Sequence, residues 1–130
     1  MATKGTNLSF YNKSELPEAK YFKIGLVVSE WNNEITENLF QGAFDALTDV
    51  GVIKENIVRW NVPGSFELIY GCKKIQESFE MLDAVIAIGS VIQGETKHFD
   101  FACHSVTNGI AQLNLNTDVP TIFCVLTDNH

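Results

Sequence analysis

The sequence has few basic residues and few cysteines, and each shortage excludes a class of protein. Lys and Arg number 9 against 16 Asp and Glu, which gives a formal net charge of −7. Nucleic-acid binding depends on clustered Lys and Arg that neutralise phosphates, so this balance argues against a nucleic-acid partner. The three cysteines, Cys72, Cys103 and Cys124, form no CxxC pair, which is typical of reduced thiols and not of a disulfide framework.

Long apolar runs are also absent. The first twenty residues contain no apolar segment long enough for a signal peptide. No later segment approaches the ~20 apolar residues that span a bilayer. We therefore expect a cytoplasmic protein without a membrane partner. Its 130 residues, of which 45% are hydrophobic, are enough for one domain with a proper core.

Strand and helix patterns alternate along most of the chain. Polar residues 1–20 predict an N-terminal arm, in which Leu8–Tyr11 is the only apolar part, and residues 21–130 predict one α/β domain. Apolar, β-branched runs predict strands at 21–29, 56–62, 83–89 and 120–126. Helical spacing predicts helices at 33–49 (ended by Gly51), 65–78 and 96–114, the last with Phe101, Val106, Ile110 and Leu113 facing inward. This alternation indicates a three-layer α/β/α fold with a four-stranded parallel sheet, whose ligands bind beyond the carboxyl ends of the strands.

The loop after the third expected strand, Gly89–Asp100, is the first candidate site. Its sequence GSVIQGETKHFD is similar to the phosphate loop GxxxxGK[ST], but Glu95 stands where that loop has its lysine. A carboxylate there would repel phosphates, so nucleoside triphosphate hydrolysis is disfavoured. The N–H groups at a helix N-terminus can still attract an anion. A plain strand-to-helix turn with Thr96 as N-cap remains the alternative.

His98 lies in the first turn of the helix that follows this loop. An imidazole beside an anion site suits proton transfer near pH 7. The alternative is a surface histidine without a chemical task. We expect no metal site here, because His98, Cys103 and His104 do not share one helical face.

Three other strand ends bring further groups to the same edge of the expected sheet. Trp31 follows the first strand, where it either lies beside a ligand or caps the core. Ser65 and Glu67 follow the second strand, where they either hold a ligand or settle as the cap and first turn of a helix. Phe123, in the fourth strand, is by default a core residue. Together, four strand ends make a stronger case for a ligand site than any one of them.

These segments resemble the 6,7-dimethyl-8-ribityllumazine synthase family. The resemblance rests on VVSEWNNEIT, PGSFE, DAVIAIGSVIQGETKHFDF and PTIFCVLT, and it covers Phe22 to the end of the chain. It implies the flavodoxin-like lumazine synthase fold. The family continues with a helix, a phosphate-binding arginine and a Gly-Asn-Lys-Gly segment, so the resemblance also implies that the C-terminal part is missing after His130. Weak binding of the phosphorylated substrate and low activity would follow.

The resemblance implies a reaction and a set of site residues. Family enzymes condense 5-amino-6-(D-ribitylamino)uracil with 3,4-dihydroxy-2-butanone 4-phosphate, the penultimate step of riboflavin biosynthesis, without a cofactor or metal. His98 would transfer protons, and Glu95 and Thr96 would present N–H groups to the substrate phosphate. The pyrimidine contacts would be Trp31, Ser65, Phe66, Glu67, Ser90, Val91, Ile92 and, in the site of the neighbouring subunit, Phe123.

The family also implies partners. Besides its small-molecule substrates, we expect a homopentamer or a sixty-subunit icosahedral shell, with riboflavin synthase as a further partner and the N-terminal arm paired to a neighbour's sheet. Two other functions remain open from the residues alone. One is a shell-forming or ligand-holding protein of the same fold without catalysis. The other is a flavodoxin-like phosphate binder, which would explain the loop but neither PGSFE nor Trp31.

Overall fold

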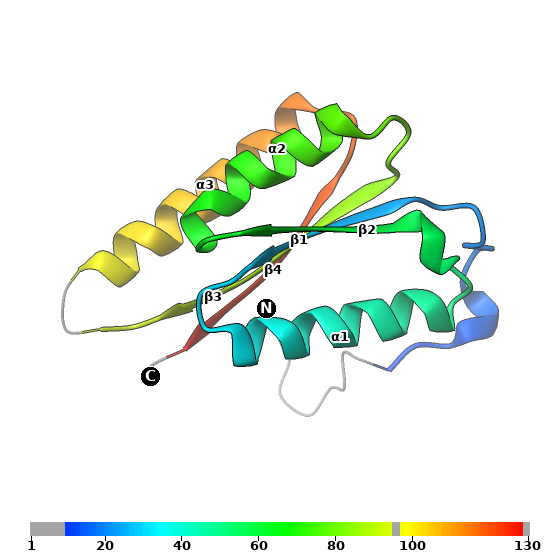
Figure 1. Ribbon diagram of the computed structural model, residues 1–130, viewed down its shortest axis with the longest axis horizontal. Coiled ribbons are helices and arrows are strands. Elements are labelled where there is room, and N and C mark those ends of the chain that lie inside the picture. Colours follow the sequence, from blue (N-terminus) through cyan, green and yellow to red (C-terminus); the bar gives the residue numbers. More distant parts are fainter. Residues whose placement is uncertain (1–9, 95–96, 129–130) are drawn as a thin grey trace.

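The computed structural model describes residues 10–94 and 97–128, which form three layers around a parallel sheet (Figure 1). The strands lie in the order β2-β1-β3-β4, and every neighbouring pair is parallel. Their bounds are β1 Ile24–Ser29, β2 Ile57–Val62, β3 Ala84–Ile92 and β4 Thr121–Asp128. The predicted three-layer α/β/α fold with a four-stranded parallel sheet is confirmed.

Three α-helices cover the sheet. Helix α1, Asn33–Asp49, lies on one face, and α2, Leu68–Ser78, and α3, His98–Asn116, lie on the other (Figure 1). Short 3₁₀ helices occupy Lys13–Glu15, Lys54–Asn56 and Ser65–Glu67. Helix α1 has its predicted bounds, and Gly51 follows it with a φ of +105°, a conformation that favours glycine. In the part of the chain that the structure describes, no helix is long and apolar enough to cross a membrane.

Several element boundaries differ from the sequence-based expectation: β1 begins at Ile24 and not at residue 21, and the other strands and α3 differ by one to three residues. Two differences lie at the carboxyl edge of the sheet. Strand β3 continues beyond Gly89, because β4 runs beside it as far as the Ile92–Asp128 pair. The expected helix 65–78 divides into a 3₁₀ turn and α2. The Ser65 side chain bonds the end of β3 there and does not cap a helix. The first difference extends the sheet at its carboxyl edge, and the second places the Ser65 side chain against that edge.

The sheet separates two apolar cores. Strand β1 is buried along its whole length, with Leu26 and Val28 in the core under α1 and Val27 in the core under α2 and α3. The second core also holds Leu68 and Ile75 of α2, both fully buried. Burial of apolar surface contributes roughly 25 cal/mol per Å². These two cores therefore stabilise the strands from which the loops at their carboxyl ends leave.

The N-terminal segment contacts the far end of α1. The Tyr11 hydroxyl donates to Asp49 Oδ2 at 2.6 Å, and Lys13 Nζ donates to Asp49 Oδ1 at 3.4 Å. The hydrogen bond from Tyr11, helped by Lys13, lowers the pKa of Asp49. Of the apolar stretch predicted at Leu8–Tyr11, residues 8 and 9 lie outside the described part of the chain.

Candidate active site

A pocket of about 600 Å³ lies at the carboxyl ends of β1, β2 and β3. The loop after β1, the 3₁₀ helix Ser65–Glu67, the end of β3 and the start of α3 all contribute to it. It is lined by Trp31, Gly64, Ser65, Phe66, Glu67, Ser90, Val91, Ile92, His98, Phe101, Ala102 and Ser105. This is the edge at which parallel α/β sheets bind ligands, and the volume is that of a small-molecule site.

The pocket brings together all the candidate pyrimidine contacts except Phe123, and it places His98 beside them. Phe123 lies in the outer strand β4, in register with Ala87, and it is half exposed. It does not line this pocket. The two residues expected at the substrate phosphate, Glu95 and Thr96, lie outside the described residues.

Trp31 is held at the pocket by the backbone that follows β1. The Trp31 N–H donates to the Pro63 carbonyl at 3.0 Å, and the Glu30 N–H donates to the Val62 carbonyl at 2.8 Å. These bonds continue the pairing of β1 with β2 beyond the strand ends. The Trp31 side chain remains 53% exposed, so its ring can still accept a planar ligand.

Behind the pocket, three polar side chains join the end of β3 to its surroundings. Ser65 Oγ donates to the Ser90 carbonyl and accepts from the Ser90 N–H, both at 3.1 Å. Asn32 Nδ2 donates to Ser90 Oγ at 3.2 Å. The close approach requires glycine at position 89, because a Cβ on Gly89 would lie 2.5 Å from Ser65 Oγ. None of these contacts was predicted from the sequence.

Helix α3 supplies the opposite wall of the pocket. His98 is its first residue and is exposed, and Phe101, Ala102 and Ser105 follow at spacings that share one helical face. The prediction that Phe101 faces the core is wrong, because its side chain is 68% exposed and lines the pocket. Val106, Ile110 and Leu113 are buried as predicted. The helical spacing from His98 was the signal that could have identified Phe101, Ala102 and Ser105.

The cysteines are poorly suited to nucleophilic chemistry. Burial raises the pKa of Cys72 to about 12 and also raises the pKa of Cys124. Burial, with the nearby Asp100 carboxylate, raises the pKa of Cys103. Thiols with raised pKa values stay protonated near neutral pH and are weak nucleophiles. Among residues 10–94 and 97–128, no group of three or more His, Cys, Asp or Glu side chains is arranged to hold a metal ion.

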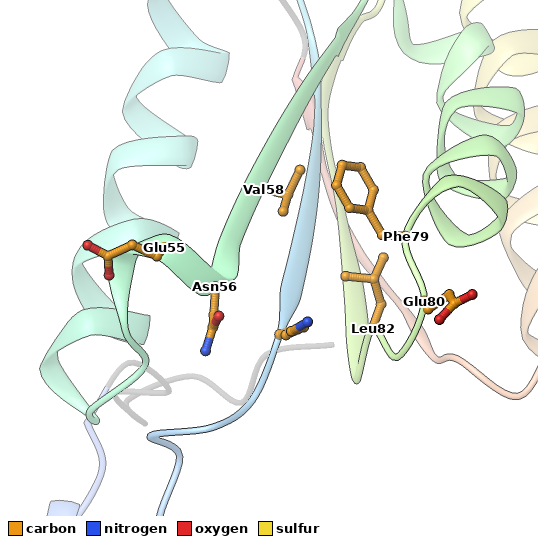
Figure 2. Close-up of a pocket in the computed structure, with 7 residues that line it drawn as sticks. Glu55, Asn56, Val58, Phe79, Glu80 and Leu82 are labelled. Atoms are coloured by element: carbon orange, nitrogen blue, oxygen red, sulfur yellow. The ribbon is translucent and has the colours of Figure 1, made fainter.

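A smaller cavity, of about 240 Å³, lies at the opposite edge of the sheet and contains none of the predicted site residues. Figure 2 shows Val58, Phe79 and Leu82 grouped together, while the carboxylates of Glu55 and Glu80 lie apart on either side of them. Polar groups that bind a ligand have to converge on it. The carboxyl edge, where aromatic, carboxylate and imidazole side chains share one pocket, is therefore the better candidate for the active site.

Residues 21–130 match a family model described as 6,7-dimethyl-8-ribityllumazine synthase. A protein of that name from Christiangramia forsetii is 72% identical over 130 residues, which are 100% of this chain and 77% of the relative. A protein of the same name from Flavobacterium johnsoniae is 62% identical over 130 residues, covering 100% of this chain and 68% of the relative. Another protein of that name, from Flavobacterium psychrophilum, is 59% identical over 129 residues, which are 99% of this chain and 68% of the relative.

Proposed function

This chain belongs to the 6,7-dimethyl-8-ribityllumazine synthase family, and we propose that the pocket at the carboxyl edge of its sheet is the pyrimidine site. The function of the chain is the synthesis of 6,7-dimethyl-8-ribityllumazine in riboflavin biosynthesis. The observation that supports this site is that Trp31, Glu67 and His98, which follow three different strands, line one pocket. A phosphate binder without a pyrimidine site would not need these groups together.

Each wall of the pocket offers the pyrimidine substrate a different interaction. The exposed rings of Trp31 and Phe66 present apolar faces on which a heterocycle can stack. The Glu67 carboxylate, which is half-buried at the pocket, can accept hydrogen bonds from the ribityl hydroxyls. The backbone of Ser90–Ile92 is the wall against which the polar edge of the heterocycle would bind.

The reaction joins an aryl amine to a ketone. Addition of the amine to the ketone and loss of water give a Schiff base, and phosphate then leaves. Attack by the second nitrogen on the remaining carbonyl carbon, with loss of a second water, closes the ring. Two substrates have to be aligned throughout, and alignment of this kind lowers a barrier by roughly 7–11 kcal/mol at best. His98 would move the protons, and general acid–base help of this kind is typically worth about 10²–10⁴-fold. The N–H groups of Glu95 and Thr96 remain our proposal for the substrate phosphate.

The proposal is tested by following lumazine formation from both substrates, first in the unmodified chain and then in a variant whose pocket is filled by a larger side chain. Ala102 lines the pocket, so Ala102→Trp is expected to reduce pyrimidine binding by about 100-fold or more through overlap with the ligand. Ala111→Trp is the control, because Ala111 is exposed on the same helix and outside the pocket. Equal loss in both variants, or none in Ala102→Trp, would exclude this pocket.

His98 is expected to assist catalysis without being indispensable. Because alignment supplies more of the rate than proton transfer does, His98→Ala should lower kcat by about 10-fold or somewhat more and change pyrimidine affinity little. His104→Ala is a matched control, since His104 is also exposed on α3 and does not line the pocket. An unchanged kcat in His98→Ala would remove this residue from the mechanism.

We further propose a cytoplasmic homo-oligomer, a pentamer or a shell of twelve pentamers, with riboflavin synthase as a partner. The half-exposed Phe123, which lies outside the pocket of its own chain, supports a role in the site of a neighbouring subunit. In the same assembly, the N-terminal arm would contact a neighbour while Tyr11 and Lys13 keep their bonds to Asp49 of their own chain. Sedimentation that finds only monomers under assay conditions would refute this assembly.

A further inference from the structure

Strand β3 extends past its neighbour β1 on the way to the pocket. Their pairing runs from Ile24–Ala84 to Val28–Ile88. In a parallel sheet, alternate residues of a strand direct their N–H and C=O groups to the same neighbour. The next such residue after Ile88 is Ser90, whose N–H and C=O are both bonded to Ser65 Oγ. The Ser65 hydroxyl therefore takes the place of a further β1 residue and fixes the strand where it becomes the pocket wall.

The only proton of the Ser65 hydroxyl is used in this bonding. A serine hydroxyl has a single proton to donate, and in Ser65 that proton goes to the Ser90 carbonyl. Only 8% of the residue is exposed. The side chain has no further proton to donate to a ligand, so we assign it the role of positioning Ser90.

Asn32 holds Ser90 from the other side. Its backbone is left-handed, with φ 59° and ψ 52°, and its side chain makes no capping bond to α1. The amide instead donates to Ser90 Oγ at 3.2 Å. Since Trp31 directly precedes Asn32 and its own N–H is bound by Pro63, the backbone on both sides of the ring is fixed.

We infer that the Asn32 and Ser65 side chains form a clamp on Ser90 that positions the β3 wall and the Trp31 ring for the pyrimidine. They are positioning residues and act as one unit through Ser90. The inference rests on the proposed function of the pocket and deepens it, because it explains how two of the pocket's walls keep a fixed relation to each other. Without the clamp, each wall would have to be ordered when the ligand binds, at a cost in affinity.

The test compares Ser65→Ala, Asn32→Gly and the double variant, with equilibrium binding of 6,7-dimethyl-8-ribityllumazine as the measurement. Glycine can adopt the left-handed backbone at position 32 without strain, and it removes the side chain that carries the amide. Each single variant should weaken binding by about 5- to 10-fold, the range expected for one net hydrogen bond, with a smaller change in kcat. The dissociation constant of the double variant should be at most about twice that of the single variant that binds less tightly, because either change alone already releases Ser90.

Two further variants separate positioning from general destabilisation. Asn32→Asp should recover most of the affinity lost in Asn32→Gly, because aspartate tolerates the left-handed backbone and can accept a bond from the Ser90 hydroxyl. Asn114→Ala is the matched control at the far edge of the sheet. Asn114 also replaces a strand neighbour, with its Nδ2 donating to the Thr121 carbonyl at 2.9 Å and its Oδ1 accepting from the Thr121 N–H at 2.6 Å. Asn114→Ala should lower the free energy of unfolding and leave the affinity for the lumazine unchanged.

The outcomes are distinguishable. If the unmodified protein binds no lumazine, the proposed function of the pocket fails. If it binds, two results would refute the clamp and leave the site standing. One is unchanged affinity in Ser65→Ala and Asn32→Gly; the other is a loss of affinity in the double variant that equals the product of the two single losses. A matching loss of affinity in Asn114→Ala would also overturn the clamp. The ligand-free fluorescence of Trp31, measured with Trp60→Phe as background, should change in both clamp variants and stay the same in Asn114→Ala.

Discussion

Replacing Trp31 with alanine is expected to weaken binding of the pyrimidine substrate by about 5- to 150-fold, because stacking of a base on an aromatic ring is worth ~1–3 kcal/mol. Trp31 lines the pocket with half of its surface exposed, so removal of the ring takes away a stacking face without opening the core. The ring touches no reacting atom in our proposal. We therefore expect KM to rise and kcat to change much less, which steady-state kinetics and a binding titration would both report.

Two variants control for this prediction. Trp31→Phe keeps a stacking face and should recover most of the affinity. Tyr70→Ala removes an aromatic side chain that is at least as exposed but lies on α2 outside the pocket, and it should bind substrate normally. Unchanged binding in Trp31→Ala would mean that the pyrimidine does not stack on this ring.

A second large effect is expected in the core beneath the pocket. Leu68 is fully buried at the start of α2, in the cluster that joins α2 and α3 to the sheet. Leu68→Ala should lower the free energy of unfolding by about 2–5 kcal/mol, because it removes buried methyl groups and leaves a cavity. Urea denaturation followed by circular dichroism would measure the change.

Leu115→Ala provides the comparison for that measurement. Leu115 lies near the end of α3 with 77% of its surface exposed, so its truncation should change stability by no more than about 0.5 kcal/mol. Similar losses in the two variants would show that Leu68 does not belong to a tightly packed core.

Local patterns in the sequence were enough to predict the layers of this fold. The apolar spacing of α1 and the glycine after it lie close together in the chain, and the helix has its predicted bounds, Asn33–Asp49. The end of β3 could not be predicted in this way. Ser90 and Ile92 read as loop residues, and they are extended because they pair with Leu126 and Asp128, which lie far along the chain.

In the candidate site too, local patterns predicted some features, and others depend on residues far apart in the chain. Trp31, Glu67 and His98 could be named because each follows a strand, and the carboxyl ends of parallel strands share one edge. Apolar periodicity led to the wrong position for Phe101, because an apolar face can line a pocket as well as a core. The bond between Ser65 and Ser90 depends on the register of β3 with its neighbours, which no local pattern specifies.

The strand order has a consequence for how the chain folds as it is synthesised. In the order β2-β1-β3-β4, each strand after the first pairs with one that has already been made: β2 with β1, β3 with the free side of β1, and β4 with β3. Among the strands in the described residues, none has to be inserted between two that are already paired. The sheet can therefore grow outward from β1 at the pace of translation. The last two strands only extend an existing template, which shortens the time that their apolar edges spend exposed to aggregation.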